Sequence, residues 1–111
     1  PACGLEYNKN RVMKVEVKEI DGVLTGFLNG RLDTAASEQC REDLKEMFEA
    51  EGRPLALDCS QLEFISSSGL RIFLELLKLA TRTGGTLKVL NPNDDVRNIF
   101  NLIGFAKRFA L

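Results

Sequence analysis

Residues 55–79 read LALDCSQLEFISSSGLRIFLELLKL, an apolar run, a polar turn with three serines and a glycine, and a longer apolar stretch. The run Leu55–Cys59 contains a single acid, which is typical of a central strand, and Leu62 to Ile65 are expected to form the loop at its carboxyl end. Apolar side chains in Leu70–Leu79 surround most of a helix, so we expect protein to cover more than one of its sides. A strand therefore passes into a buried helix within Ser66–Gly69.

The residues before this stretch predict an antiparallel hairpin. Apolar and polar residues alternate from about Val12 to Lys18, the period of a half-buried strand. Asp21-Gly22 is typical of a hairpin turn. The return strand is expected over Val23–Leu28, with Asn29-Gly30 at its end.

Helices and strands alternate in the rest of the chain. Asp33 or Thr34 is expected to cap a helix that runs to about Ala50. Thr86–Leu90 predicts a strand, and the spacing of apolar residues predicts a helix from Asp94 that ends at Gly104. The order predicts an α/β fold with a mixed, largely parallel sheet of four or five strands, an N-terminal antiparallel hairpin and three or more helices.

Composition restricts the class of protein. A chain of 111 residues that is 44% apolar and 28% charged predicts one globular domain, which we place at 11–111 after a loose N-terminus at 1–10. Lys and Arg number 15 against 16 Asp and Glu without a basic cluster, so we expect no direct binding of nucleic acid. The apolar runs are too short to insert in a membrane and no signal peptide is recognisable, so we expect a cytoplasmic protein.

The reactive residue types argue against an enzyme. Cys3, Cys40 and Cys59 are widely spaced and the chain has no histidine, which predicts free thiols and no metal site. Without histidine a Ser-His-Asp triad is impossible, and no Gly-x-Ser-x-Gly sequence surrounds the serines. Glycine-rich phosphate loops are also missing from the sequence, so we expect no cofactor.

Two interpretations of the serine run stand side by side. A serine before a helix is a common N-cap, and one serine is sufficient for that role. The start of a helix also favours an anion, because its N–H groups are unpaired and the helix dipole is positive there. Gly69 is expected to allow another molecule's backbone or an incoming nucleotide to approach closely.

The stretch 57–74 resembles the signature of the sulfate transporter and anti-sigma factor antagonist (STAS) domain family. In that signature an acidic strand end and a Phe/Tyr-Ile/Met pair precede Asp-Ser-Ser/Thr-Gly-Leu and an apolar helix. The similarity covers nearly the whole chain in order, including the segments 24–34, 84–87 and 99–105. It implies the fold given above and a role in partner switching rather than catalysis.

The resemblance implies an anti-sigma factor antagonist. The unphosphorylated form of such a protein binds an anti-sigma factor, which is a serine kinase, and thereby releases a sigma factor. Phosphorylation at the position of Ser67 switches it off, and a phosphatase reverses the mark. The family commonly has Asp before this serine, whereas this chain has Ser66. This departure implies a change in kinase recognition or in the regulation itself, and it makes Ser66 a rival acceptor. Ser68 is the other rival.

The same resemblance implies a docking surface for the partner around the serine run. The residues assigned to it are Asp33, Thr34, Glu63, Ser66, Ser68, Gly69, Leu70 and Arg71. A homodimer is left open. The alternative within this fold is an accessory STAS module of a membrane transport ATPase or of a stress-sensing assembly, without phosphorylation.

Overall fold

The computed structural model describes residues 13–102 and residue 104. Four strands form one sheet in the order β1-β2-β3-β4, with β1 and β2 antiparallel and the other neighbours parallel. The predicted mixed sheet with an antiparallel hairpin is therefore confirmed. In chain order the elements are β1 (Met13–Ile20), β2 (Val23–Leu32), α2 (Thr34–Asp43), α3 (Lys45–Phe48), β3 (Pro54–Ile65), α4 (Ser67–Arg82), β4 (Thr86–Leu90) and α5 (Asp94–Leu102).

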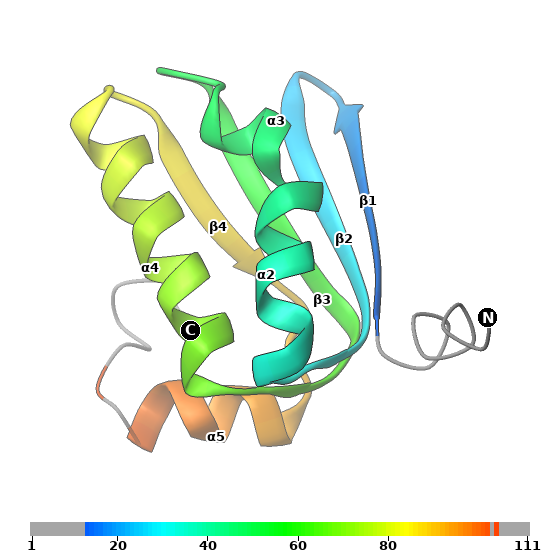
Figure 1. Cartoon of the computed structure of the whole chain (residues 1–111). Helices are drawn as coiled ribbons and strands as arrows, with labels where there is room; N and C mark the ends of the chain where they lie inside the picture. The colour runs from blue at the N-terminus through cyan, green and yellow to red at the C-terminus, as the bar shows by residue number, and fades with distance from the viewer. Residues whose placement is uncertain (1–12, 103, 105–111) are drawn as a thin grey trace, which may run out of the picture.

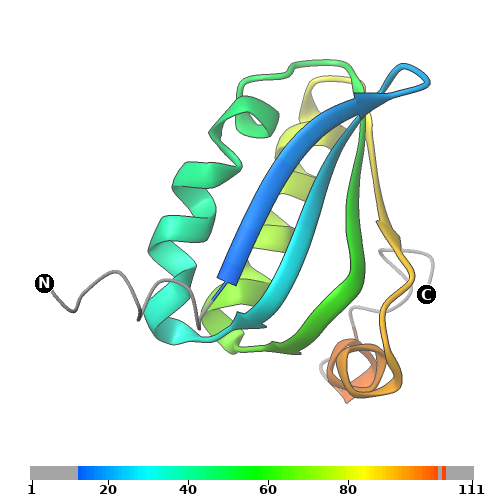
Figure 2. The same ribbon diagram turned by 90° about the vertical axis from the view of Figure 1, so that its right-hand side faces the viewer.

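The helices α2, α3 and α4 lie over one face of the sheet (Figure 1). The view turned by 90° shows α5 at the end of the sheet where β4 finishes (Figure 2). There Phe100 of α5 packs edge-on against Phe73 of α4, with ring centroids 5.8 Å apart. Both rings are fully buried, so α5 closes this end of the hydrophobic core.

The hairpin between β1 and β2 turns at the two predicted residues. Asp21 and Gly22 have φ values of 53° and 84°, which is the backbone that a tight two-residue hairpin turn requires. Ile20 pairs with Val23 across this turn. The described part of β1 begins at Met13, so the expected start at Val12 lies outside the described residues.

Two strands are longer than the sequence predicts. β2 continues through Asn29-Gly30 to Leu32, and β3 continues to Ile65 instead of entering a loop after Cys59. The pairing of the two strands shifts between Phe27 and Asn29 and again between Gly30 and Arg31. Such irregularities interrupt the alternation of apolar and polar residues by which a strand is recognised in a sequence. The parallel pairing nevertheless continues to Leu32 and Ile65, where it provides hydrogen-bond partners for the backbone.

The expected single helix to Ala50 is wrong, because the chain turns at Leu44 between α2 and α3. Leu44 and Met47 are both fully buried. They pack over Gly26 of β2, where an added Cβ would lie 2.9 Å from a Leu44 methyl and 3.0 Å from the Met47 sulfur. The turn keeps both side chains on the sheet, with a glycine below them to make room.

The later elements follow the sequence closely. The helix predicted after the serine run is α4, which begins after Ser66 and ends before Gly84, whose φ is 83°. The strand β4 has the predicted bounds Thr86–Leu90. The third helix ends at Leu102, and Gly104 follows with a φ of 75°. The loose N-terminus at 1–10 lies outside the described residues.

Two of the three cysteines are part of the core. Cys40 on α2 and Cys59 on β3 are free and about 1% or less exposed. Burial, helped by the nearby Asp43 carboxylate, raises the pKa of the Cys40 thiol from an ordinary 9.0 to about 12. Burial raises the pKa of Cys59 to about 12 as well, with smaller effects of Asp58 and Cys40. Both thiols are therefore protonated and act as small apolar side chains.

We expect these two thiols to resist alkylation in the native protein. Raising a pKa from 9.0 to about 12 lowers the thiolate fraction near neutral pH by roughly a factor of a thousand. Peptide mapping after iodoacetamide treatment at pH 8 should show Cys40 and Cys59 unmodified until denaturant is added. Rapid labelling of either residue in the folded protein would contradict the burial described here.

Candidate functional site

The serine run lies where the parallel strands β2 and β3 end. Leu32 and Ile65 form the last register pair of these strands, and each is followed within two residues by the start of a helix. The backbone N–H of Ser66 donates to the carbonyl oxygen of Leu32 at 2.8 Å. The starts of α2 and α4 are therefore fixed next to each other.

A side-chain cap begins each of the two helices. Oδ1 of Asp33 accepts from the N–H of Ala36 at 2.9 Å, which confirms Asp33 rather than Thr34 as the N-cap of α2. Oγ of Ser66 accepts from the N–H of Gly69 at 3.1 Å and caps α4. Both interactions satisfy N–H groups that a helix start leaves unpaired.

The three serines have different environments. Ser66 is half-buried and its hydroxyl oxygen serves as the cap. Ser67 is the first residue of α4, it is exposed, and within 13–102 its hydroxyl takes part in no hydrogen bond. Ser68 is half-buried and lies against the groove between α2 and α4. Ser67 is thus the hydroxyl of the run that is open to another molecule.

Gly69 serves the protein's own packing. A Cβ at this position would lie 2.6 Å from Cγ of Leu32 and 3.0 Å from Cγ1 of Ile65. Gly69 is buried, and Leu70 is 5% exposed. The expectation that another molecule's backbone approaches Gly69 is therefore corrected, because Leu32 fills that space.

A shallow groove of about 360 Å³ separates α2 from α4 beside the serine run. An ion pair between Arg41 of α2 and Glu75 of α4 joins its two sides. The groove is lined by Thr34, Ser37, Glu38, Arg41, Ser68, Arg71, Ile72 and Glu75. Its lining is mixed in charge and combines polar and apolar surface, as a docking surface for a protein segment can.

The structure brings together only part of the predicted docking surface. Thr34, Ser68 and Arg71 meet in the groove. Glu63 is exposed near the end of β3, on the strand that leads to the serine run. Sequence reasoning missed Ser37, Glu38, Arg41 and Ile72, because the contact between two helices far apart in the chain leaves no local pattern.

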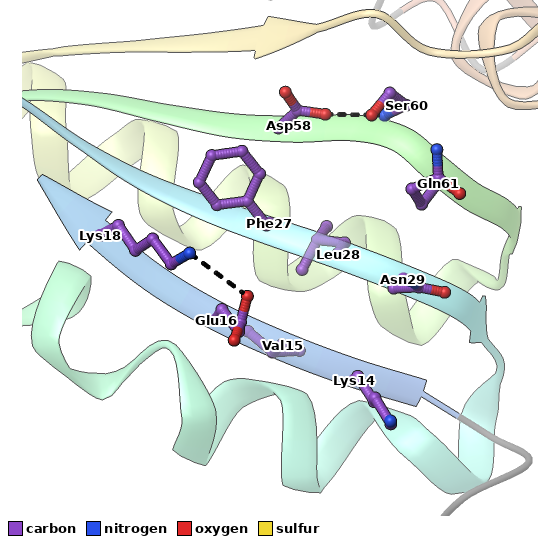
Figure 3. A pocket seen from close by; sticks show the side chains of 10 residues that line it. All are labelled: Lys14, Val15, Glu16, Lys18, Phe27, Leu28, Asn29, Asp58, Ser60 and Gln61. Atoms are coloured by element: carbon purple, nitrogen blue, oxygen red, sulfur yellow. Dashed lines mark hydrogen bonds and ion pairs between the residues drawn. The ribbon is translucent and has the colours of Figure 1, made fainter. Parts of the chain in front are cut away.

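A second groove of about 550 Å³ lies over β1, β2 and β3 (Figure 3). Its lining includes Lys18 and Glu16, whose charged groups are 3.8 Å apart, and the ring of Phe27 lies under the Lys18 ammonium at 6.0 Å. Asp58 on β3 accepts from the N–H of Ser60 at 2.9 Å. This groove contains none of the predicted site residues.

The described residues show neither a metal centre nor a membrane helix. Within 13–102 and at 104, no group of three or more Cys, Asp or Glu residues is placed to hold a metal ion. In the same part of the chain, every helix is too short or too polar to cross a membrane.

Comparison with known proteins assigns the family. Residues 14–111 match the STAS domain. The chain is also 33% identical over 99 residues to the anti-sigma factor antagonist BtrV of Bordetella bronchiseptica, covering 89% of this chain and 85% of the relative. The chain belongs to the STAS domain family. The family and the name of this relative agree with the expectation of a regulator rather than an enzyme.

Further similarities agree with this assignment. The anti-sigma F factor antagonist of Paenibacillus polymyxa is 29% identical over 96 residues, which covers 86% of this chain and 82% of the relative. The fold is shared with the anti-sigma factor antagonist SpoIIAA in its unphosphorylated form, at a TM-score of 0.72 and 24% identity. That match covers 85% of this chain and 84% of SpoIIAA. The predicted STAS fold is therefore confirmed.

We expect substitution of Ser66, which caps α4, to destabilise the domain more than substitution of Ser67 does. Ser66→Ala removes the hydroxyl that accepts from Gly69 and should cost about 1 kcal/mol. For a domain of this size, that loss lowers the Tm by about 4 °C. Ser67→Ala should change the free energy of unfolding by less than about 0.5 kcal/mol, since its hydroxyl is exposed. Equal losses in thermal melts of the two variants would contradict the assignment of the cap.

We expect Gly69→Ala to destabilise the domain although alanine favours a helix. The new Cβ would overlap Leu32, and such overpacking costs about 1 to 3 kcal/mol. Chemical denaturation would measure the loss, with Thr81→Ala on the exposed side of the same helix as the control. A Gly69→Ala variant more stable than the wild type would show that the start of α4 can move away from Leu32.

Proposed function

We propose that this STAS domain is an anti-sigma factor antagonist regulated at Ser67. In the unphosphorylated state it binds an anti-sigma factor that is also a serine kinase, and the sigma factor is released. Phosphorylation of Ser67 by that kinase ends the interaction, and a phosphatase restores it. The names of the relatives support the general role, and the environment of the serine run supports the choice of residue.

The observation that carries the proposal is the different use of the three hydroxyls. A kinase must reach the hydroxyl of its acceptor, and Ser67 presents an exposed one at the first position of α4. The rival Ser66 uses its oxygen to hold the N–H of Gly69. The rival Ser68 is half-buried in the groove between α2 and α4. Modifying either rival would disturb the start of the helix or its packing.

Ser66 replaces the usual Asp of the family without loss of the helix start. Ser and Asp are about equally favoured N-caps, since both offer an oxygen to the N–H of the third helical residue. The bond from Gly69 to Ser66 shows this use directly. The departure from the family pattern therefore changes the charge beside Ser67 and keeps a capped start of α4.

Phosphorylation at Ser67 would act through charge on a surface that stays in place. A phosphate adds about −1.5 to −2 charges, and the positive start of a helix tolerates it. An acidic or closely packed partner surface would be repelled. A loss of about 3 kcal/mol in binding corresponds to a roughly hundredfold weaker complex, which is sufficient to exchange partners.

The surface offered to the partner centres on the groove beside Ser67. Thr34, Ser68 and Arg71 belong to it, and the ion pair between Arg41 and Glu75 holds its two helices together. Asp33 takes part as the cap of α2 and Glu63 as an exposed charge nearby. Gly69 and Leu70 support this surface from below, because both are buried.

Incubation with a cognate anti-sigma kinase and ATP should place phosphate on Ser67. Mass spectrometry would locate the label, which should vanish in Ser67→Ala and persist in Ser68→Ala. No label, or a label on Ser66 alone, would contradict the proposal. It would favour the alternative of an accessory module in a transport ATPase or stress-sensing assembly.

A binding experiment offers a matched pair of charge variants. Ser67→Asp should weaken binding of the kinase at least about tenfold, a loss of about 1.4 kcal/mol. Ser66→Asp adds the same charge one residue earlier and preserves a capping oxygen, so it should bind more tightly than Ser67→Asp. Equal affinities of wild type and Ser67→Asp by calorimetry would exclude a switch based on charge.

A further inference from the structure

Arg71 lies one helical turn after Ser67 on α4, and both side chains are exposed. Residues four apart on a helix are neighbours, with their Cβ atoms about 5 to 6 Å apart. An arginine at this spacing is therefore within reach of a group attached to the Ser67 oxygen. Ser67 precedes Arg71 in the chain, so a negative group on Ser67 would lie at the N-terminus of α4, where the helix dipole favours it.

The neighbour of Arg71 on the other side of the helix turn is already engaged. Glu75 lies one turn further along α4, but it forms an ion pair with Arg41 of α2. The Arg41 guanidinium also lies 4.6 Å from the centre of the Phe48 ring, which helps to hold it there. Within 13–102, Arg71 takes part in no hydrogen bond or ion pair, so its five N–H donors are available.

The start of α4 offers further donors at the same place. The N–H of Gly69 is taken by the Ser66 hydroxyl, and the N–H of Leu70 by the Ser66 carbonyl. Within the described chain, the N–H groups of Ser67 and Ser68 make no hydrogen bond at this helix start. A phosphate on Ser67 would lie between these two N–H groups and Arg71.

We propose that Arg71 is the intramolecular counter-ion of phosphorylated Ser67. The proposal rests on the function proposed above and adds the residue that receives the phosphate. Arginine binds phosphate through paired, charge-assisted hydrogen bonds, which a lysine forms less well. Phosphorylation then changes the docking surface in two ways, because it adds a dianion and engages the Arg71 guanidinium, which is then no longer available to the partner.

The surrounding charges leave this pairing favourable. Four carboxylates lie near the helix start or the groove. Glu63 near the end of β3 is exposed, and two of the other three are engaged. Glu75 is neutralised by Arg41, and Asp33 accepts from the N–H of Ala36. Glu38 is the remaining carboxylate that lines the groove, and it opposes the phosphate from α2. Among the described residues that line the same groove, Arg71 is the cation without an ion pair, and it lies on the helix that carries Ser67.

The test uses protein that carries phosphoserine at position 67, inserted during translation so that no kinase is involved. Titration followed by ³¹P NMR gives the midpoint between the singly and doubly charged phosphate. Arg71 favours the dianion, so the midpoint of the wild type should lie about 0.3 pH unit below that of Arg71→Gln. Arg71→Lys should lie between them, and Arg82→Gln at the far end of the exposed helix face should match the wild type.

A midpoint in Arg71→Gln equal to that of the wild type would overturn the pairing. Arg71 is exposed, so far-UV circular dichroism should show the fold unchanged in every variant. As a second readout, the rise in Tm on phosphorylation should be smaller in Arg71→Gln than in the wild type, and an equal rise would also contradict the pairing. Failure of a kinase to label Ser67 would refute the proposed function and leave this titration unaffected, so the two failures are distinguishable.

Discussion

The contact of Gly69 with Leu32 and Ile65 determines how the site is built. It lets the first turn of α4 lie directly on the ends of β2 and β3, closer than any side chain on residue 69 would allow. The hydrogen bond from Ser66 to the Leu32 carbonyl fixes the same junction through the backbone. The exposed Ser67 follows at once, so the position of the proposed switch is set by core packing one or two residues away.

This junction separates a rigid support from a chemically open surface. The core residues below it are almost completely buried. The caps of α2 and α4 give the N–H groups of Ala36 and Gly69 hydrogen-bond partners within the domain. The surface above it includes the hydroxyl of Ser67 and the groove between α2 and α4. A modification there needs no rearrangement of the fold, because the groups that hold the helices differ from the groups that are exposed.

The sequence predicted the elements whose signals are local. The Asp21-Gly22 turn, the strand Thr86–Leu90 and the start of α4 after Ser66 depend on turn chemistry, alternation and capping within a few residues. The extension of β2 to Leu32 and of β3 to Ile65 depends on pairing with shifted register between distant segments. The role of Gly69 was misread for the same reason, since Leu32 is 37 residues earlier in the chain.

The first strand has a consequence for association that the helices do not share. β1 is one of the two edge strands of the described sheet, and it carries Lys14, Glu16 and Lys18 at alternate positions. Charged side chains, lysine above all, discourage another strand from extending an open sheet edge. Growth of the sheet into fibres is thereby opposed at β1, whereas the proposed docking surface lies on the side of α2 and α4.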